Sequence, residues 1–406
     1  MNPIKAPVLG ASALQARFAA LSTLLKDCAP LWRPEPRQNL WPHWLQTLSG
    51  IQNALEALGA EQILAIDSDL TAQVQLLEPF IPQAAQIPDL CAVPRWPSNP
   101  GLEAPAERAL RGVPGRKRDQ IEAFAQSSWA DTAPRLLDWC AGKGHLARTL
   151  AVSAGRPVLC VEREARLCRL GRGMAIEARA QVQFQTYDVF EPDVEGLLAP
   201  DVFAVALHAC GGLHRRLLKL VGSSGAAGLA LAPCCYHLFE PDTYQPLSLA
   251  GASVDMPLTR AQVRLCLQES VVGAARDVRA RLRGLAWRLG AEALMSELLD
   301  HSLPVGKVPG KRLRLPFGDF VQTILAERDL VLPQSADWDR WETLGWQRAE
   351  HVQRLELVRH LFRRPLELWL VLDRALFLQE QGLETHLGIF CTRSTTPRNL
   401  LLQARR

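Results

Sequence analysis

Apolar positions along the chain change their spacing several times, and each change predicts a different kind of element. Residues 11–26 and 44–58 place apolar side chains at helical spacing, so the first part of the chain is expected to be helical. From about residue 135, short apolar runs alternate with helical stretches. This alternation is typical of a doubly wound parallel sheet, and the sequence therefore predicts an α/β fold.

Short apolar runs predict the strands of this sheet. Five of them fall at residues 136–138, 157–162, 182–187, 202–207 and 228–231. Two further runs, 387–391 and 399–403, are separated by a turn, which indicates an antiparallel hairpin. The apolar helix 365–381 that precedes the hairpin is expected to pack on the sheet.

Four segments follow from these patterns. We expect a helical N-terminal region, a Rossmann-like cofactor core, a mainly helical insertion, and a helix with the hairpin that completes the sheet. Their expected limits are 1–105, 106–250, 251–364 and 365–406. The proline-rich stretch 94–105 has the composition of a linker between the first two segments.

The turn after the first predicted strand carries the most informative motif. Ala141, Gly142, Lys143 and Gly144 lie between that strand and a helix. Glycines in such a turn allow positive φ and a close approach of the backbone to a ligand, while the helix start offers free N–H groups. The spacing also fits the relaxed dinucleotide fingerprint Gly-x-Gly-x-x-Ala, so NAD is one candidate cofactor.

Asp138, at the end of the first strand, favours S-adenosylmethionine over NAD. A carboxylate beside the loop repels a pyrophosphate but attracts the ammonium and sulfonium of the methyl donor. Glu162, at the end of the second strand, is expected to accept from both ribose hydroxyls, and Asp188, after the third, from the adenine amino group. The alternative for each acid is a cap or turn of the local backbone.

Side chains able to move a proton follow the fourth and fifth strands. His208 belongs to the block 208–212, and Tyr236 and His237 to the block 234–237. Because ligands lie outside the carboxyl ends of parallel strands, these side chains are expected near the donor. We expect His237 to be the base, with Tyr236 and His208 as further candidates and His208 also as a donor contact. The alternative is that His237 is a satisfied core histidine.

A metal site at the same edge is a further alternative. Thiolates and imidazoles that converge there would favour zinc. The sequence has no Cys-x-x-Cys pair, and adjacent residues of a strand point apart, so we expect no metal. The side chains concerned are Cys140, His208, Cys210, Cys234, Cys235 and His237.

Several blocks together resemble a known family. They are similar to the S-adenosylmethionine-dependent methyltransferase-domain family that includes methyltransferase-like proteins labelled "ribosomal RNA adenine dimethylase domain-containing". The blocks are 114–121, 138–146, 207–211, 234–237, 373–374 and 396–400. The resemblance implies a class I fold and donor binding at Asp138, Gly142, Gly144 and Glu162.

The chain departs from that family at two points. Many relatives carry an acid where this chain has Gly212. Adenine amino methyltransferases carry an Asn/Asp-Pro-Pro-Tyr/Phe block after the fourth strand, where this chain has His-Ala-Cys-Gly. The methylated atom therefore stays open. A non-catalytic scaffold that binds the cofactor and works through protein partners is the alternative function.

Charge and composition narrow the setting. The 406 residues carry a net charge of only +4, which does not by itself indicate a nucleic-acid binder. Basic clusters at 116–118 and 307–314 suggest an RNA or a ribosome-associated protein as acceptor, and no DNA partner is expected. No apolar run reaches the ~18 residues of a membrane span, and no secretory segment is recognisable. Ten cysteines in such a chain indicate a reducing compartment, so a cytoplasmic location is expected.

Overall fold

The computed structural model describes residues 8–98, 105–130, 133–240, 242–268, 275–299, 301, 303–306, 308–331 and 336–406. The chain forms two compact units. The first, here called the sheet unit, comprises Met1–Lys26, Asp89–Val271 and Arg363–Arg406. The second, the helical unit, comprises Asp27–Pro88 and Val272–Phe362. Among the described residues, no helix is both long and apolar enough to cross a membrane.

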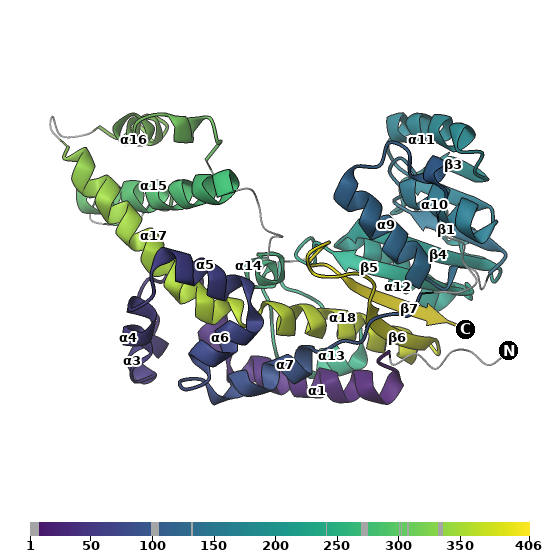
Figure 1. Cartoon of the computed structure of the whole chain (residues 1–406), viewed down its shortest axis with the longest axis horizontal. Helices are drawn as coiled ribbons and strands as arrows, with labels where there is room; N and C mark the ends of the chain where they lie inside the picture. Colours follow the sequence, from purple (N-terminus) through teal and green to yellow (C-terminus); the bar gives the residue numbers. More distant parts are fainter. Residues whose placement is uncertain are drawn as a thin grey trace. The chain divides into compact units, whose positions relative to one another are not determined.

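The sheet has seven strands in the order β3-β2-β1-β4-β5-β7-β6 (Figure 1). Strands β1 to β5 pair in parallel, whereas β7 runs antiparallel to both β5 and β6. The predicted α/β class, the class I methyltransferase sheet and the closing hairpin are therefore confirmed. The strands are β1 (Arg135–Trp139), β2 (Val158–Glu162), β3 (Val182–Thr186), β4 (Val202–Cys210), β5 (Gly228–Cys234), β6 (Glu384–Ile389) and β7 (Leu400–Arg405).

Helices cover both faces of the sheet because central strands bury apolar side chains on each side. On one face, Leu136, Val158 and Phe203 join one core with apolar residues of the helices before and after β1. On the other, Trp139 Nε1 donates to the carbonyl of Leu213 at 3.0 Å. The first-face helices are α9 (Gly115–Ser127), α10 (His145–Ala154) and α11 (Ala165–Glu177); α12 (Gly212–Ser224) covers the second.

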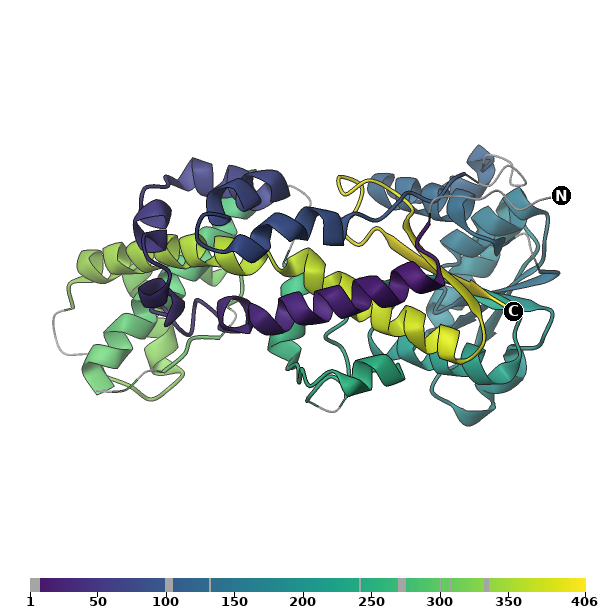
Figure 2. The ribbon, with the colours of Figure 1, turned by 90° about the horizontal axis from the view of Figure 1, so that it is seen from below.

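Helix α18 (Arg363–Glu380) packs on the hairpin strands, which confirms the apolar helix expected there. Helix α1 (Ala11–Asp27) lies beside it (Figure 2, purple and yellow-green). The rings of Phe18 and Trp369 stack with centroids 5.3 Å apart, and Trp369 Nε1 donates to Ser22 Oγ at 2.8 Å. The sheet unit therefore takes residues from all four segments expected from the sequence, and it contains only part of the N-terminal segment and of the insertion.

A buried polar network ties the chain after β5 to α18. Asp373 accepts from Tyr244 Oη at 2.6 Å and from the backbone N–H groups of Leu247 and Ser248. Arg374 donates to His214 Nε2 of α12 at 3.0 Å. Because each member is paired inside a low-dielectric core, the network holds α12 and the loop after β5 in one arrangement. Helices α13 (Leu249–Ser253) and α14 (Arg260–Val263) and the turn η4 (Arg264–Leu267) continue that loop.

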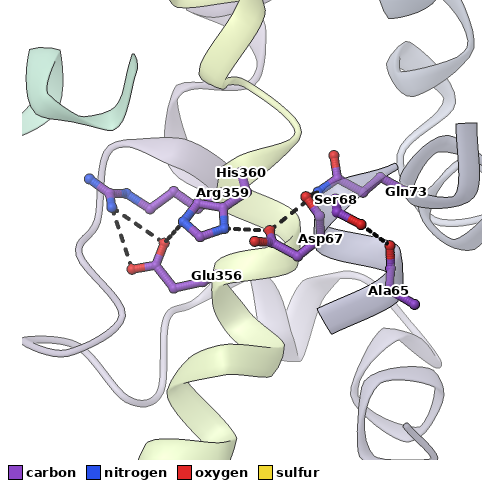
Figure 3. Close-up of polar contacts among 7 residues, drawn as sticks. All are labelled: Ala65, Asp67, Ser68, Gln73, Glu356, Arg359 and His360. Atoms are coloured by element: carbon purple, nitrogen blue, oxygen red, sulfur yellow. Dashed lines mark hydrogen bonds and ion pairs between the residues drawn. The ribbon is translucent and has the colours of Figure 1, made fainter. Parts of the chain in front are cut away.

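The helical unit has its own core between its long helices. Gly345 lets them cross closely, since a Cβ there would lie 2.3 Å from the carbonyl oxygen of Ala286. His360 links the two sequence segments of the unit: Nδ1 contacts Asp67 at 2.6 Å and Nε2 contacts Glu356 at 3.0 Å (Figure 3). The longer helices are α15 (Ala275–Leu299), α16 (Phe317–Ala326) and α17 (Trp338–His360), and shorter ones include α4 (Ile51–Glu56), α5 (Ala60–Ser68) and α6 (Leu70–Leu77).

Candidate active site

A cleft of about 1160 Å³ opens at the carboxyl ends of the parallel strands. Every one of those strand ends contributes to its walls. Cys140, Glu162, Asp188, Cys210 and His237 line it after β1, β2, β3, β4 and β5 in turn. The topology thus brings side chains that are up to 97 positions apart in the chain to one sheet edge, where ligands of open α/β sheets bind.

The loop between β1 and α10 has a tightly constrained backbone. Gly142 and Gly144 have φ of +58° and +64°. A Cβ on Gly144 would lie 2.5 Å from Cζ of Phe184, whereas one on Gly142 would meet no atom within 4 Å. Ala141 donates its N–H to the carbonyl of Val161 at 3.1 Å, and Lys143 completes the turn. The loop is therefore packed against β2 and β3, with open space at Gly142.

Asp138 lies behind this loop. Its side chain is buried, and Oδ2 accepts from the N–H of Ala147 at 3.2 Å in the first turn of α10. Burial raises the pKa of this carboxyl to about 7, although that hydrogen bond and the charge of Lys117 act in the opposite direction. Asp138 does not line the cleft, so it acts on a ligand there through its charge and through the loop.

Glu162 is held rigidly at the end of β2. Oε2 accepts from the N–H of Gly142 and Oε1 from the N–H of Glu164, both at 2.9 Å. Each carboxylate oxygen can accept a second hydrogen bond. Glu162 also lines the cleft, so two acceptor positions remain for a vicinal diol. The capping contact expected as the alternative is present.

Asp188 makes a local turn and also lines the cleft. Its Oδ1 accepts from the N–H of Phe190 at 3.1 Å, and its Oδ2 lies 3.7 Å from Nη1 of Arg163. The neighbouring Tyr187 lines the same wall, and the ring of Phe190 is 57% exposed. An exposed aromatic ring beside a carboxylate suits a flat heterocycle with an amino group. The sequence interpretation missed the aromatic pair, although both residues flank the acid it singled out.

Three adjacent strands end in strained residues. Cys140 after β1, His208 in β4 and Cys235 after β5 have φ of +58°, +67° and +46°, although none is glycine. Residues with side chains rarely adopt this region, and such strain persists only where the surroundings enforce it. At Gly211 (φ +49°), a Cβ would lie 1.9 Å from the carbonyl oxygen of Leu238, so the loop after β5 packs directly on β4.

The three expected proton carriers differ in position. His237 lines the cleft, and its Nδ1 has no hydrogen-bond partner among the described residues. Burial and the charge of Arg264 lower its pKa, so the ring is neutral and able to accept a proton. Tyr236 instead is buried, with Oη donating to the carbonyl of Pro233 at 3.2 Å. Tyr236 does not line the cleft, so its position does not support the expected part in proton transfer.

His208 is occupied by a neighbour. Its Nε2 lies 2.7 Å from Oε1 of Gln120 on α9, and the residue does not line the cleft. Burial and the charges of Lys117 and Arg398 lower its pKa, which keeps it neutral. Its position supports β4 and α9 rather than direct contact with a reacting atom. Of the expected carriers, His237 alone has its side chain on the cleft wall.

Three thiols gather beside His237. Sγ of Cys210 and Sγ of Cys234 lie 3.5 Å apart, and Sγ of Cys235 lies within 4.8 Å of both. The expectation that adjacent cysteines point apart is wrong here, because the positive φ of Cys235 takes it out of the strand pattern. The hydrogen bond from Cys234 lowers the pKa of Cys210 to about 6, against the effect of burial.

One wall of the cleft is basic. Arg215, Arg216 and Lys219 reach it from α12, and Arg260 and Arg264 reach it from α14 and η4. The sequence interpretation assigned none of these five residues to the site. The i, i+4 spacing of Arg260 and Arg264 places both on one helical face. Only the fold shows that this face borders the cleft.

The basic clusters chosen from the sequence lie elsewhere. Arg118 pairs with Glu107 and Glu122, at 2.6 and 3.0 Å. Arg312 pairs with Glu327, and Lys307 lies outside the described residues. Neither cluster lines the cleft.

Comparison with known proteins identifies the part of the chain that carries the cleft. Residues 116–242 match a family model described as a methyltransferase domain. A 129-residue stretch, 31% of this chain, is 26% identical to a glutathione S-transferase C-terminal domain-containing protein homolog from Drosophila pseudoobscura pseudoobscura. That stretch spans 21% of the fly protein. Together with the strand order, the family match supports a methyltransferase domain at residues 116–242.

Proposed function

We propose that this protein is an S-adenosylmethionine-dependent methyltransferase whose acceptor is a polyanion, most simply an RNA. The observation that carries the proposal is the single cleft that joins a diol-accepting carboxylate, Glu162, to a basic wall at the ends of the parallel strands. The donor would supply a methyl group already activated by its sulfonium. The chain's own residues then have to orient the acceptor and remove its proton.

The donor side fits S-adenosylmethionine in its charges. Glu162 offers two acceptor positions for the ribose hydroxyls, and Asp188 with Phe190 offers a place for the adenine. The open space at Gly142 admits close approach of the methionine part to the loop backbone. When ionised, Asp138 beneath the loop favours an ammonium there and disfavours a pyrophosphate, which supports the methyl donor over NAD.

The acceptor side fits a phosphate-bearing molecule. Five basic residues line the same cleft as His237: Arg215, Arg216, Lys219, Arg260 and Arg264. Arg216 lines the cleft, and a guanidinium there can bind phosphate oxygens through two parallel hydrogen bonds. Such cations bind phosphates without reading a base sequence. His237 lies on the same wall and is our candidate for the proton acceptor.

The chemistry after β4 argues against an adenine amino group as the methylated atom. Asn/Asp-Pro-Pro-Tyr/Phe blocks place a carbonyl and an aromatic ring against that group, and here β4 ends in His208, Cys210 and Gly211. We therefore propose RNA as the class of acceptor and leave the adenine dimethylase label of the resembling proteins aside.

Calorimetric titration with S-adenosylhomocysteine tests the donor site, with NAD as the control ligand. Micromolar binding of the first ligand alone supports the proposal, and binding of NAD instead overturns it. Tritiated methyl transfer from the donor to RNA and to protein fractions then tests the acceptor. Label that ribonuclease releases supports RNA, and label that only protease releases refutes it. Donor binding without transfer to any fraction would favour the non-catalytic scaffold.

A matched pair of variants separates the basic wall from general charge. Arg264→Gln removes a cation from the cleft, whereas Arg314→Gln removes one from the basic stretch outside it. We expect the first variant to weaken RNA binding and the second to leave it unchanged. Both variants should bind S-adenosylhomocysteine with the same affinity. Equal losses of RNA binding would show that the wall is not the acceptor site.

A further inference from the structure

The three thiols beside the cleft have the spacing of a metal-binding set. Tetrahedral zinc–thiolate sites have Zn–S distances of about 2.3 Å, which places neighbouring sulfurs about 3.8 Å apart. Here Cys210 and Cys234 are 3.5 Å apart, and all three Sγ atoms lie within 4.8 Å of one another. Shifts of a few tenths of an ångström at each side chain would bring all three into that geometry.

The backbone fixes this arrangement before any ligand binds. Cys210 and Cys234 are register partners at the ends of two paired strands, β4 and β5. Cys235 is turned toward them by its positive φ. The turn is held in place because the N–H of Gly212 donates to the carbonyl of Leu238 at 2.8 Å. Ligands on strand ends that are locked in this way form a preorganised site.

We propose that Cys210, Cys234 and Cys235 bind one zinc ion as thiolates, with its fourth coordination position open to the cleft. Cys234 is buried whereas Cys210 lines the cleft, so three ligands come from the protein wall and the remaining direction faces the cavity. Three protein ligands with an open position are the pattern of catalytic rather than structural zinc. A disulfide would use only two of the three thiols.

Charge around the site is compatible with such an ion. A divalent zinc with three thiolates carries one net negative charge. Arg216 and Arg264 line the same cleft and offset it. An open zinc position lowers the pKa of an oxygen or sulfur atom bound there, so the ion would activate an acceptor group next to the donor. Acceptor activation depends on the proposed methyl transfer, whereas zinc binding does not.

Metal binding is tested on the full-length protein purified without added metal or chelator. Elemental analysis should find about one zinc per chain. After the metal is removed, titration with cobalt(II) should produce thiolate-to-cobalt charge-transfer absorption, and added zinc should abolish that absorption. Protons should be released as the thiols bind the ion. Absence of both the zinc and the charge-transfer band from folded protein would overturn the proposal.

Single variants assign the ligands. Cys210→Ala, Cys234→Ala and Cys235→Ala should each lower zinc affinity by more than ~100-fold, the upper range for loss of an outer-shell partner. Cys391→Ala, which removes a buried thiol outside the cluster, should keep the wild-type affinity. Circular dichroism confirms that each variant is folded. Retained stoichiometric zinc in the three cluster variants, or an equal loss in Cys391→Ala, would contradict the assignment.

Calorimetric titration with S-adenosylhomocysteine keeps this test separate from the proposed function. Binding of S-adenosylhomocysteine without zinc would refute the metal site alone. Binding of zinc without S-adenosylhomocysteine would refute the donor site alone.

Discussion

Replacing Asp138 with Asn removes a buried charge from beneath the cofactor loop and keeps the shape of the side chain. The Asn oxygen can still accept from the N–H of Ala147, as Asp138 does at 3.2 Å. Because burial raises the pKa of Asp138 from 3.8 to about 7, the folded protein binds this proton more tightly than the unfolded chain. The contribution of Asp138 to the free energy of unfolding therefore falls as the pH rises from about 4 to 7 and is constant above that.

The size of the effect follows from the pKa difference. Each pKa unit corresponds to about 1.4 kcal/mol, so a shift of about three units costs the wild type about 4 kcal/mol at pH 8 and almost nothing at pH 4. Asp138→Asn should recover that cost, so its gain in unfolding free energy over the wild type should grow with pH. At pH 8 it should nevertheless bind S-adenosylhomocysteine more weakly, because the charge that attracts the ammonium is gone.

Urea unfolding of both proteins between pH 4 and pH 8 measures the difference, since other titrating groups act equally in the two and cancel. Asp201→Asn is the matched control: Asp201 is half-exposed, and its hydrogen bond to Arg135 lowers its pKa. That variant should lose stability at pH 8 rather than gain it. A pH-independent difference for Asp138→Asn, or a loss at pH 8, would refute the burial of an uncompensated carboxylate.

Three further outcomes are expected. Glu162→Gln keeps one acceptor oxygen and should weaken the binding of S-adenosylhomocysteine by about 2 kcal/mol in calorimetry. An unchanged affinity would place the ribose elsewhere. Gly211→Ala puts a Cβ against the Leu238 carbonyl at a residue with positive φ. It should therefore lower the free energy of unfolding of the sheet unit in urea by at least about 1–2 kcal/mol. An unchanged free energy of unfolding would show that the loop moves to accept the methyl group. His360→Ala should cost the helical unit about 2 kcal/mol near neutral pH, measured by hydrogen exchange in α17, because it removes one contact each from Asp67 and Glu356. An unaffected α17 would contradict that.

The sheet and its cofactor edge are predictable from the sequence because their signals are local. Each parallel strand is a short apolar run that ends in an acid, a cysteine or a histidine, and the parallel topology alone then brings Glu162, Asp188 and His237 to one edge. The hairpin was equally visible from two apolar runs around a turn. In these elements the burial pattern follows directly from a period in the sequence.

Features set by long-range packing could not be predicted. The side chains of Ser22 and Trp369 meet across 347 positions, and the ring of Phe18 stacks on the same tryptophan; contacts of this kind place α1 in the sheet unit. The burial of Asp138 depends on the helices above β1, and the convergence of three thiols depends on the φ of Cys235. Arg264 carries no motif that would mark it as part of a site. Each of these follows from tertiary structure that no local pattern encodes.

The composition of the two units has a consequence for how the protein can be cut and rebuilt. The helical unit is encoded in two stretches, Asp27–Pro88 and Val272–Phe362, so the polypeptide passes between the units four times. A protease cut at any one passage leaves the units covalently joined through the others. A contiguous gene fragment that ends between these two stretches encodes only one of them, so it lacks part of the helical unit. Separate production of the helical unit would instead require fusing its two stretches through a designed linker.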